Sequence, residues 1–84
     1  IALSATCVRV PTLRGHAEAL TLTFDSEVNA DEAREILSRA PNLVILDKPD
    51  EALYPMPATC IDKNETFVGV FVGMYTLKIC YTFL

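Results

Sequence analysis

Two side chains near the start of the chain are of types that could do chemistry together. Arg9 and His16 stand seven residues apart, and His16 is the single histidine in the sequence. An imidazole can accept and donate a proton near neutral pH. A planar guanidinium can form two parallel hydrogen bonds with a carboxylate, so Arg9 is a candidate for binding an acidic substrate. Residue type alone leaves simpler roles open: a surface histidine, and an arginine paired with a carboxylate of the fold.

The segments on either side of this pair are predicted to be β-strands. Residues 1–10 favour a strand with Arg9 on its small-residue face, and Pro11 should end it or lie at a sheet edge. Gly15 gives backbone freedom to the connection that follows. Residues 17–24 alternate leucine and phenylalanine with threonine, which predicts a second strand with one apolar face. We therefore expect the guanidinium and the imidazole to open into a common cleft.

A single helix is predicted over residues 29–40. Asn29 is a good N-cap residue, and Glu32 stands three positions later, as in a capping box. Pro41 should end the helix, because the residue before a proline is disfavoured in helical angles. The face expected to be buried consists of Ala30, Ala33, Ile36, Leu37 and Ala40.

The remaining segments complete an α+β pattern. The wholly apolar run 43–46 is typical of a strand covered on both faces, so residues 17–46 predict a right-handed crossover between parallel strands. Three prolines and several charges make 47–57 a solvent-exposed loop. The run 67–84, with Lys78 as its one charge, predicts two strands turning near Gly73. A membrane span and a poorly packed tail are the alternatives for this run. The expected architecture is a mixed β-sheet covered by helix on one face.

The composition is typical of one small globular domain. The chain has 84 residues, 51% of them apolar and 21% charged, and its net charge of −4 comes with no basic stripe for nucleic acid. Cys7, Cys60 and Cys80 lack the spacing of a disulfide framework or a zinc site, so we expect buried thiols in a reducing compartment. The first residues lack the features of a signal peptide and form a strand-like run, and we expect the natural protein to begin earlier.

Two stretches around the candidate pair carry a family likeness. They are SATCVRVP at residues 4–11 and LRGHAEA at residues 13–19. They resemble the histidine-bearing segment of the aspartate-semialdehyde dehydrogenases. Weaker matches are DEAR at 31–34, VILD at 44–47, YP at 54–55 and FVG at 67–69, so the likeness covers about residues 1–69. Residues 70–84 depart from the family pattern, and an altered reading frame is one explanation.

The resemblance implies an activity and roles for both side chains. Members of this family reduce β-aspartyl phosphate with NADPH, in the pathway to lysine, threonine and methionine, after a cysteine thiolate attacks the acyl phosphate. By resemblance, His16 is the acid/base histidine and Arg9 binds the substrate carboxylate. The nucleophilic cysteine belongs to a segment outside this chain, and Cys7 does not match it. A thiol needs a nearby imidazole to become a good nucleophile, which gives His16 a chemical reason to be there.

The resemblance also implies an incomplete enzyme. Residues 1–84 would form a single partial substrate-binding and dimerisation domain, with the fold of the C-terminal domain of glyceraldehyde-3-phosphate dehydrogenase-like enzymes. The nucleotide-binding domain is not in this chain, so NADP belongs to the complete enzyme and this chain alone should bind no cofactor or metal and be inactive. A homodimer is expected, with aspartate semialdehyde or β-aspartyl phosphate as ligand, without nucleic acid or membrane. The expected location is the cytoplasm, or a plastid in a plant or alga.

Two other functions stay open. The chain could be a stand-alone, non-catalytic module for dimerisation or for binding small acids. It could also belong to a related acyl-phosphate reductase of the N-acetylglutamyl-phosphate class. The spacing between the CVRV stretch and the Gly15–His16 pair favours the aspartate enzyme over that class.

Overall fold

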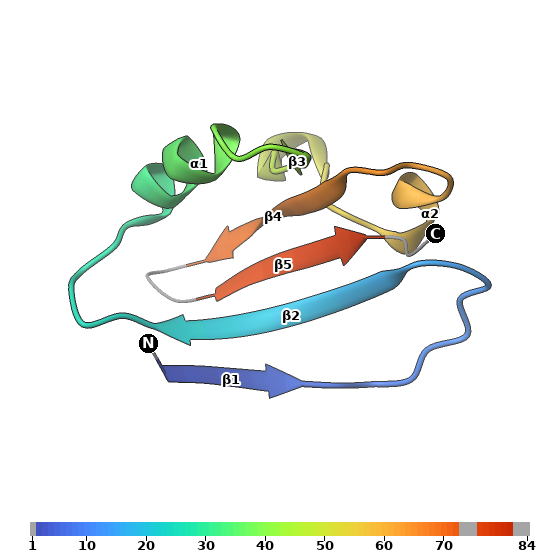
Figure 1. Cartoon of the computed structure of the whole chain (residues 1–84), viewed down its shortest axis with the longest axis horizontal. Coiled ribbons are helices and arrows are strands. Elements are labelled where there is room, and N and C mark those ends of the chain that lie inside the picture. Colours follow the sequence, from blue (N-terminus) through green and yellow to red (C-terminus); the bar gives the residue numbers. More distant parts are fainter. Residues whose placement is uncertain (1, 73–75, 82–84) are drawn as a thin grey trace.

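One mixed β-sheet forms the body of the protein (Figure 1). The computed structural model describes residues 2–72 and 76–81, and this part of the chain contains five strands in the order β1-β2-β5-β4-β3. Neighbouring strands are antiparallel, except that β3 and β4 are parallel. The strands are β1 Ala2–Thr6, β2 His16–Thr23, β3 Leu43–Ile45, β4 Thr66–Val72 and β5 Thr76–Tyr81.

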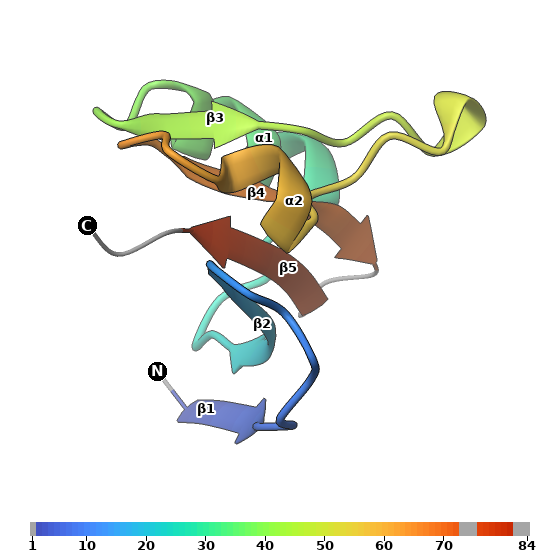
Figure 2. The same ribbon diagram turned by 90° about the vertical axis from the view of Figure 1, so that its right-hand side faces the viewer.

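Three short helical segments accompany the sheet in the part of the chain that the structure describes. The helix α1, Ala30–Ser38, packs against β3 and β4, and α2, Pro57–Cys60, contacts β5. The 3-10 helix η1, Pro49–Glu51, lies in the connection from β3 to α2, and Figure 2 shows this connection reaching away from the sheet. The α+β class predicted from the sequence is confirmed. No helix in the described residues is long and apolar enough to cross a membrane.

The first strand is shorter than predicted. Pairing between β1 and β2 ends with Thr6 opposite Ala19, so residues 7–10 lie outside the sheet. Val8 and Val10 beyond the strand are 73% and 53% exposed. Pro11, which lacks an N–H group, would interrupt a ladder. The prediction that Arg9 leaves from a strand face is therefore wrong: Arg9 lies in the connection between β1 and β2.

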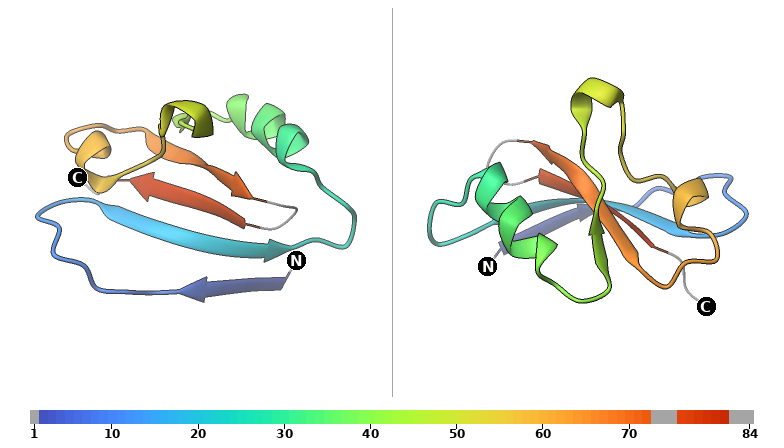
Figure 3. Two further views of the ribbon diagram at one scale, coloured as in Figure 1. Left: turned by 180° about the vertical axis from the view of Figure 1, so that it is seen from behind. Right: turned by 90° about the horizontal axis from the view of Figure 1, so that it is seen from above.

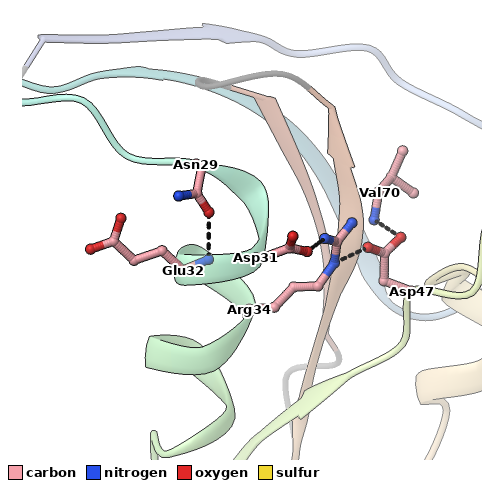
Figure 4. A network of polar contacts seen from close by, with 6 residues as sticks. All are labelled: Asn29, Asp31, Glu32, Arg34, Asp47 and Val70. Atoms are coloured by element: carbon pink, nitrogen blue, oxygen red, sulfur yellow. Dashed lines mark hydrogen bonds and ion pairs between the residues drawn. The ribbon is translucent and has the colours of Figure 1, made fainter.

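The helix begins as its sequence predicts, but it is buried less than expected. The side chain of Asn29 accepts a hydrogen bond of 2.8 Å from the backbone N–H of Glu32 (Figure 4), which satisfies one of the open donors at the helix start. Ile36, expected on the buried face, is 58% exposed. The strand β3 beside the helix has only three residues, so it offers little surface for α1 to cover.

The two strands predicted in the apolar run 67–84 are β4 and β5, and each has a neighbouring strand on both sides. β2 and β3 run in the same direction, as the crossover pattern predicts, but β5 and β4 lie between them. The prediction of two strands for the apolar run is confirmed, while its turn near Gly73 lies outside the described residues. Phe67 and Val68 of β4 are buried together with Cys60 of α2, so the densest packing lies on β4.

A buried carboxylate ties α1 to an irregular stretch of β4 (Figure 4). The side chain of Asp47 is 3% exposed and accepts hydrogen bonds from Arg34 Nε at 2.7 Å and from the Val70 N–H at 3.0 Å. Val70 has a φ of 57°, a left-handed conformation that is costly for a β-branched residue, and the register with β5 shifts beside it. The hydrogen bond with Asp47 raises the pKa of Arg34 above its ordinary value, although partial desolvation opposes it. The expectation that the charges of 47–57 favour solvent is wrong for Asp47.

We expect the substitution Asp47→Ala to lower the free energy of unfolding by about 2–3 kcal/mol. It removes the acceptor of the Val70 N–H and leaves the guanidinium of Arg34 without its buried partner. The estimate stays at the low end for buried pairs because the Arg34 side chain is 31% exposed and partly screened. Urea denaturation would measure the change, with the exposed acid Asp50 as control. If Asp47→Ala costs no more than Asp50→Ala, the buried carboxylate does not stabilise the irregular stretch of β4.

Candidate functional site

His16 is the first residue of β2 and is exposed. It pairs with Tyr81, the last residue of β5, and the neighbouring pair across β4 and β5 joins Cys80 to Phe67 near the start of β4. His16 therefore lies at the end of the sheet where β5 finishes and β4 begins. The connection from β1 and the helix α2 lie at this same end (Figure 1).

Arg9 is exposed on the connection that leads to His16, here called the 7–15 loop. The three other arginines of the chain form ion pairs: Arg14 with Asp62, Arg34 with Asp47 and Asp31, and Arg39 with Glu35. Among the residues that the structure describes, Arg9 has no such partner. The simpler role considered for it, pairing with a carboxylate of the fold, therefore finds no support in this part of the chain. Its convergence with His16 on one cleft stays a prediction.

Apolar packing does little to hold the 7–15 loop. Val8, Val10 and Leu13 are 73%, 53% and 102% exposed. Polar contacts give it shape instead: the Thr12 N–H donates to the Val10 carbonyl at 2.9 Å, and Arg14 reaches across to Asp62. Gly15 then takes a φ of 91°, which favours glycine, and brings the chain into β2.

All three cysteines were expected to be buried, and this prediction is wrong for Cys7. Cys7 is exposed, because β1 ends at Thr6 and leaves it outside the sheet. Cys60 is buried in α2, where its Sγ donates to the Pro57 carbonyl at 3.1 Å. The side chain of Cys80 is outside what the structure describes. In the described ranges 2–72 and 76–81, no three His, Cys, Asp or Glu side chains gather in a way that could hold a metal ion.

The contact between Arg14 and Asp62 was missed by sequence reasoning. Arg14 reads as a solvated loop charge, and nothing in the local sequence marks Asp62. The two residues are 48 positions apart, yet Arg14 Nη1 lies 2.8 Å from Asp62 Oδ1. Asp62 belongs to the connection between α2 and β4, which the views of Figure 3 place beside the 7–15 loop. Only the topology of the sheet brings these segments together.

The fold and the sequence both match a known class of domain. The family model described as semialdehyde dehydrogenase, dimerisation domain, matches residues 2–79, and the chain belongs to this family. The match includes residues 70–79, although residues 70–84 were expected to depart from the family pattern. A solved structure of aspartate semialdehyde dehydrogenase II from Vibrio cholerae has the same fold, with a TM-score of 0.74 and 21% identity over 88% of this chain and 23% of that chain.

Two similar curated proteins have the name aspartate-semialdehyde dehydrogenase. The chain is 46% identical over 80 residues to an aspartate-semialdehyde dehydrogenase of Campylobacter jejuni, covering 94% of this chain and 23% of that protein. It is 42% identical over 69 residues to the enzyme of Aquifex aeolicus, covering 82% of this chain and 20% of that protein. The resemblance stated from the residues is thus confirmed. The chain spans about a fifth of the length of these relatives.

Proposed function

We propose that this chain forms part of an NADP-dependent aspartate-semialdehyde dehydrogenase, in which Arg9 binds the substrate carboxylate and His16 transfers a proton. The observation that carries the proposal is that Arg9 is exposed and forms no ion pair within the described residues. Arg9 lies on the 7–15 loop, which leads directly to His16. The 46% identity with the Campylobacter jejuni enzyme supports the choice of reaction.

The two side chains have different tasks in this reaction. A guanidinium that holds the carboxylate of β-aspartyl phosphate fixes the carbon skeleton and so places the reacting carbonyl. An imidazole within reach of the reacting centre can take the proton of a thiol before attack, and can later exchange a proton with the substrate oxygen. The nucleophilic thiol itself is expected from a segment of the relatives that this chain does not cover.

Under this proposal, the dinucleotide site belongs to another part of the complete enzyme. NADP supplies hydride chemistry to the complete enzyme, and its pyrophosphate needs a glycine-rich turn at a helix start. The three glycines of the chain, Gly15, Gly69 and Gly73, do not have the spacing of that glycine-rich fingerprint, and none of them opens α1 or α2. We therefore place the cofactor in a part of the enzyme that this chain does not cover.

A homodimer is part of the proposal. In the described part of the chain, the buried apolar side chains belong to few residues, chiefly Pro55, Cys60, Phe67 and Val68. Many large apolar side chains stay exposed, Leu3, Ile36 and Met56 among them. Exposed apolar surface on so small a domain favours cover by another surface, and the family description supports a second copy.

A hybrid enzyme tests the proposal. The matching 80-residue segment of the Campylobacter jejuni relative would be replaced by this chain, and phosphate-dependent reduction of NADP by aspartate semialdehyde would be measured. We expect turnover by the hybrid and none by this chain alone. The parent enzyme is the positive control. A hybrid that folds and dimerises without turnover would contradict the catalytic proposal and favour a non-catalytic dimerisation module.

A further inference from the structure

We infer that the ion pair between Arg14 and Asp62 is a positioning device that fixes the 7–15 loop, with Arg9 on it and His16 at its end. The functional meaning of this inference rests on the proposed function of Arg9 and His16. The contact itself is a property of the fold: Arg14 Nη1 and Asp62 Oδ1 are 2.8 Å apart. Arg14 would act through Arg9 and His16 and would not touch the substrate.

The geometry of the contact suits such a role. Arg14 stands two residues before His16, and Gly15 between them takes a φ of 91°. Asp62 follows α2 and has a φ of 58°, a conformation that aspartate tolerates better than most residues. Both partners thus sit where the backbone turns sharply. Fixing Arg14 against Asp62 fixes the direction in which the chain enters β2.

The energetics explain why an exposed pair can matter here. The two side chains are 66% and 72% exposed, and such pairs contribute little to global stability. Opening of a loop, however, has a much lower free energy than global unfolding when few apolar contacts resist it. The apolar side chains of this loop are exposed, so packing gives it little resistance. A small electrostatic contribution therefore changes the fraction of time that the loop is ordered.

Amide hydrogen exchange of the whole 84-residue chain, followed by NMR, tests the inference. We expect Arg14→Gln and Asp62→Asn each to speed exchange of the loop amides by about two- to five-fold, the range of exposed ion pairs. The double variant should be no faster than either single variant, because both remove one contact. Arg14→Lys should restore part of the protection. The matched control is Arg39→Gln, whose exposed pair with Glu35 lies on α1.

Unchanged loop exchange in Arg14→Gln, or additive effects in the double variant, would overturn the inference. A second readout separates it from the proposed function. With aspartate semialdehyde as the probe of the hybrid enzyme, Arg14→Gln should weaken binding by the factor seen in exchange, and Arg9→Ala should abolish it. If the hybrid enzyme folds and binds no probe while the exchange results hold, the proposed function fails and the positioning of the loop stands.

Discussion

Replacing His16 by alanine in the hybrid enzyme should lower kcat by about 10²- to 10⁴-fold, the usual contribution of a positioned acid or base. His16 is exposed at the start of β2, so the substitution removes no buried packing. Its strand pairing with Tyr81 involves the backbone and survives the change. The loss should therefore fall on the chemical step and leave the fold intact, and steady-state kinetics with circular dichroism would check both.

Two further measurements separate chemistry from structure at this position. Exogenous imidazole should restore part of the activity of His16→Ala, because a diffusing base can occupy the vacated space. Thr21→Ala, an exposed position of the same strand, is the matched control and should keep the parent rate. A kcat for His16→Ala within threefold of the hybrid enzyme would remove His16 from the proposed acid/base role.

Replacing Gly69 by alanine should lower the free energy of unfolding by about 3 kcal/mol, a large share of the roughly 5–15 kcal/mol of a typical domain. A Cβ at this position would lie 2.1 Å from the Leu46 carbonyl oxygen, 2.9 Å from its carbon and 2.9 Å from Pro55 Cδ. The Leu46 atoms belong to the backbone, and the Leu46 N–H is bonded to the Val68 carbonyl at 2.8 Å. The methyl group therefore meets atoms that move only if β4 separates from the segment after β3.

Urea denaturation of the isolated chain would measure this effect. Ala19→Val is the matched control, because it also adds apolar volume within a strand but at an exposed position of β2. We expect that control to change the free energy of unfolding by no more than about 0.5 kcal/mol. Equal stability of Gly69→Ala and the parent chain would mean that β4 can shift away from Leu46 at little cost.

The sequence predicts local features of this fold well. The start of α1 at Asn29 and the strands in 17–24, 43–46 and 67–84 depend on periodicity and capping within short windows. The end of β1 differs from the prediction because the length of a strand depends on its partner: residues 7–10 continue the strand-like pattern, but pairing with β2 ends at Thr6. The insertion of β5 and β4 between β2 and β3 depends on contacts that no local pattern encodes.

In the candidate site, too, local sequence reveals some residues, whereas other contacts depend on the whole fold. Arg9 and His16 were found from residue type, spacing and family resemblance, which are present in the sequence. The contact between Arg14 and Asp62 could not be found, because it joins residues 48 positions apart through the arrangement of two connections. The burial of Asp47 was missed for a related reason: its partners Arg34 and Val70 come from a helix before it and a strand after it.

The central place of β5 determines when the sheet can be completed during synthesis. Its partners on either side are β2, from the first third of the chain, and β4, which precedes it directly. Until residues 76–81 have left the ribosome, the hairpin β1–β2 and the unit of α1, β3 and β4 have no shared strand. During that interval the edges of β2 and β4 present unpaired backbone N–H and C=O groups, to which a chaperone or another extended segment can pair.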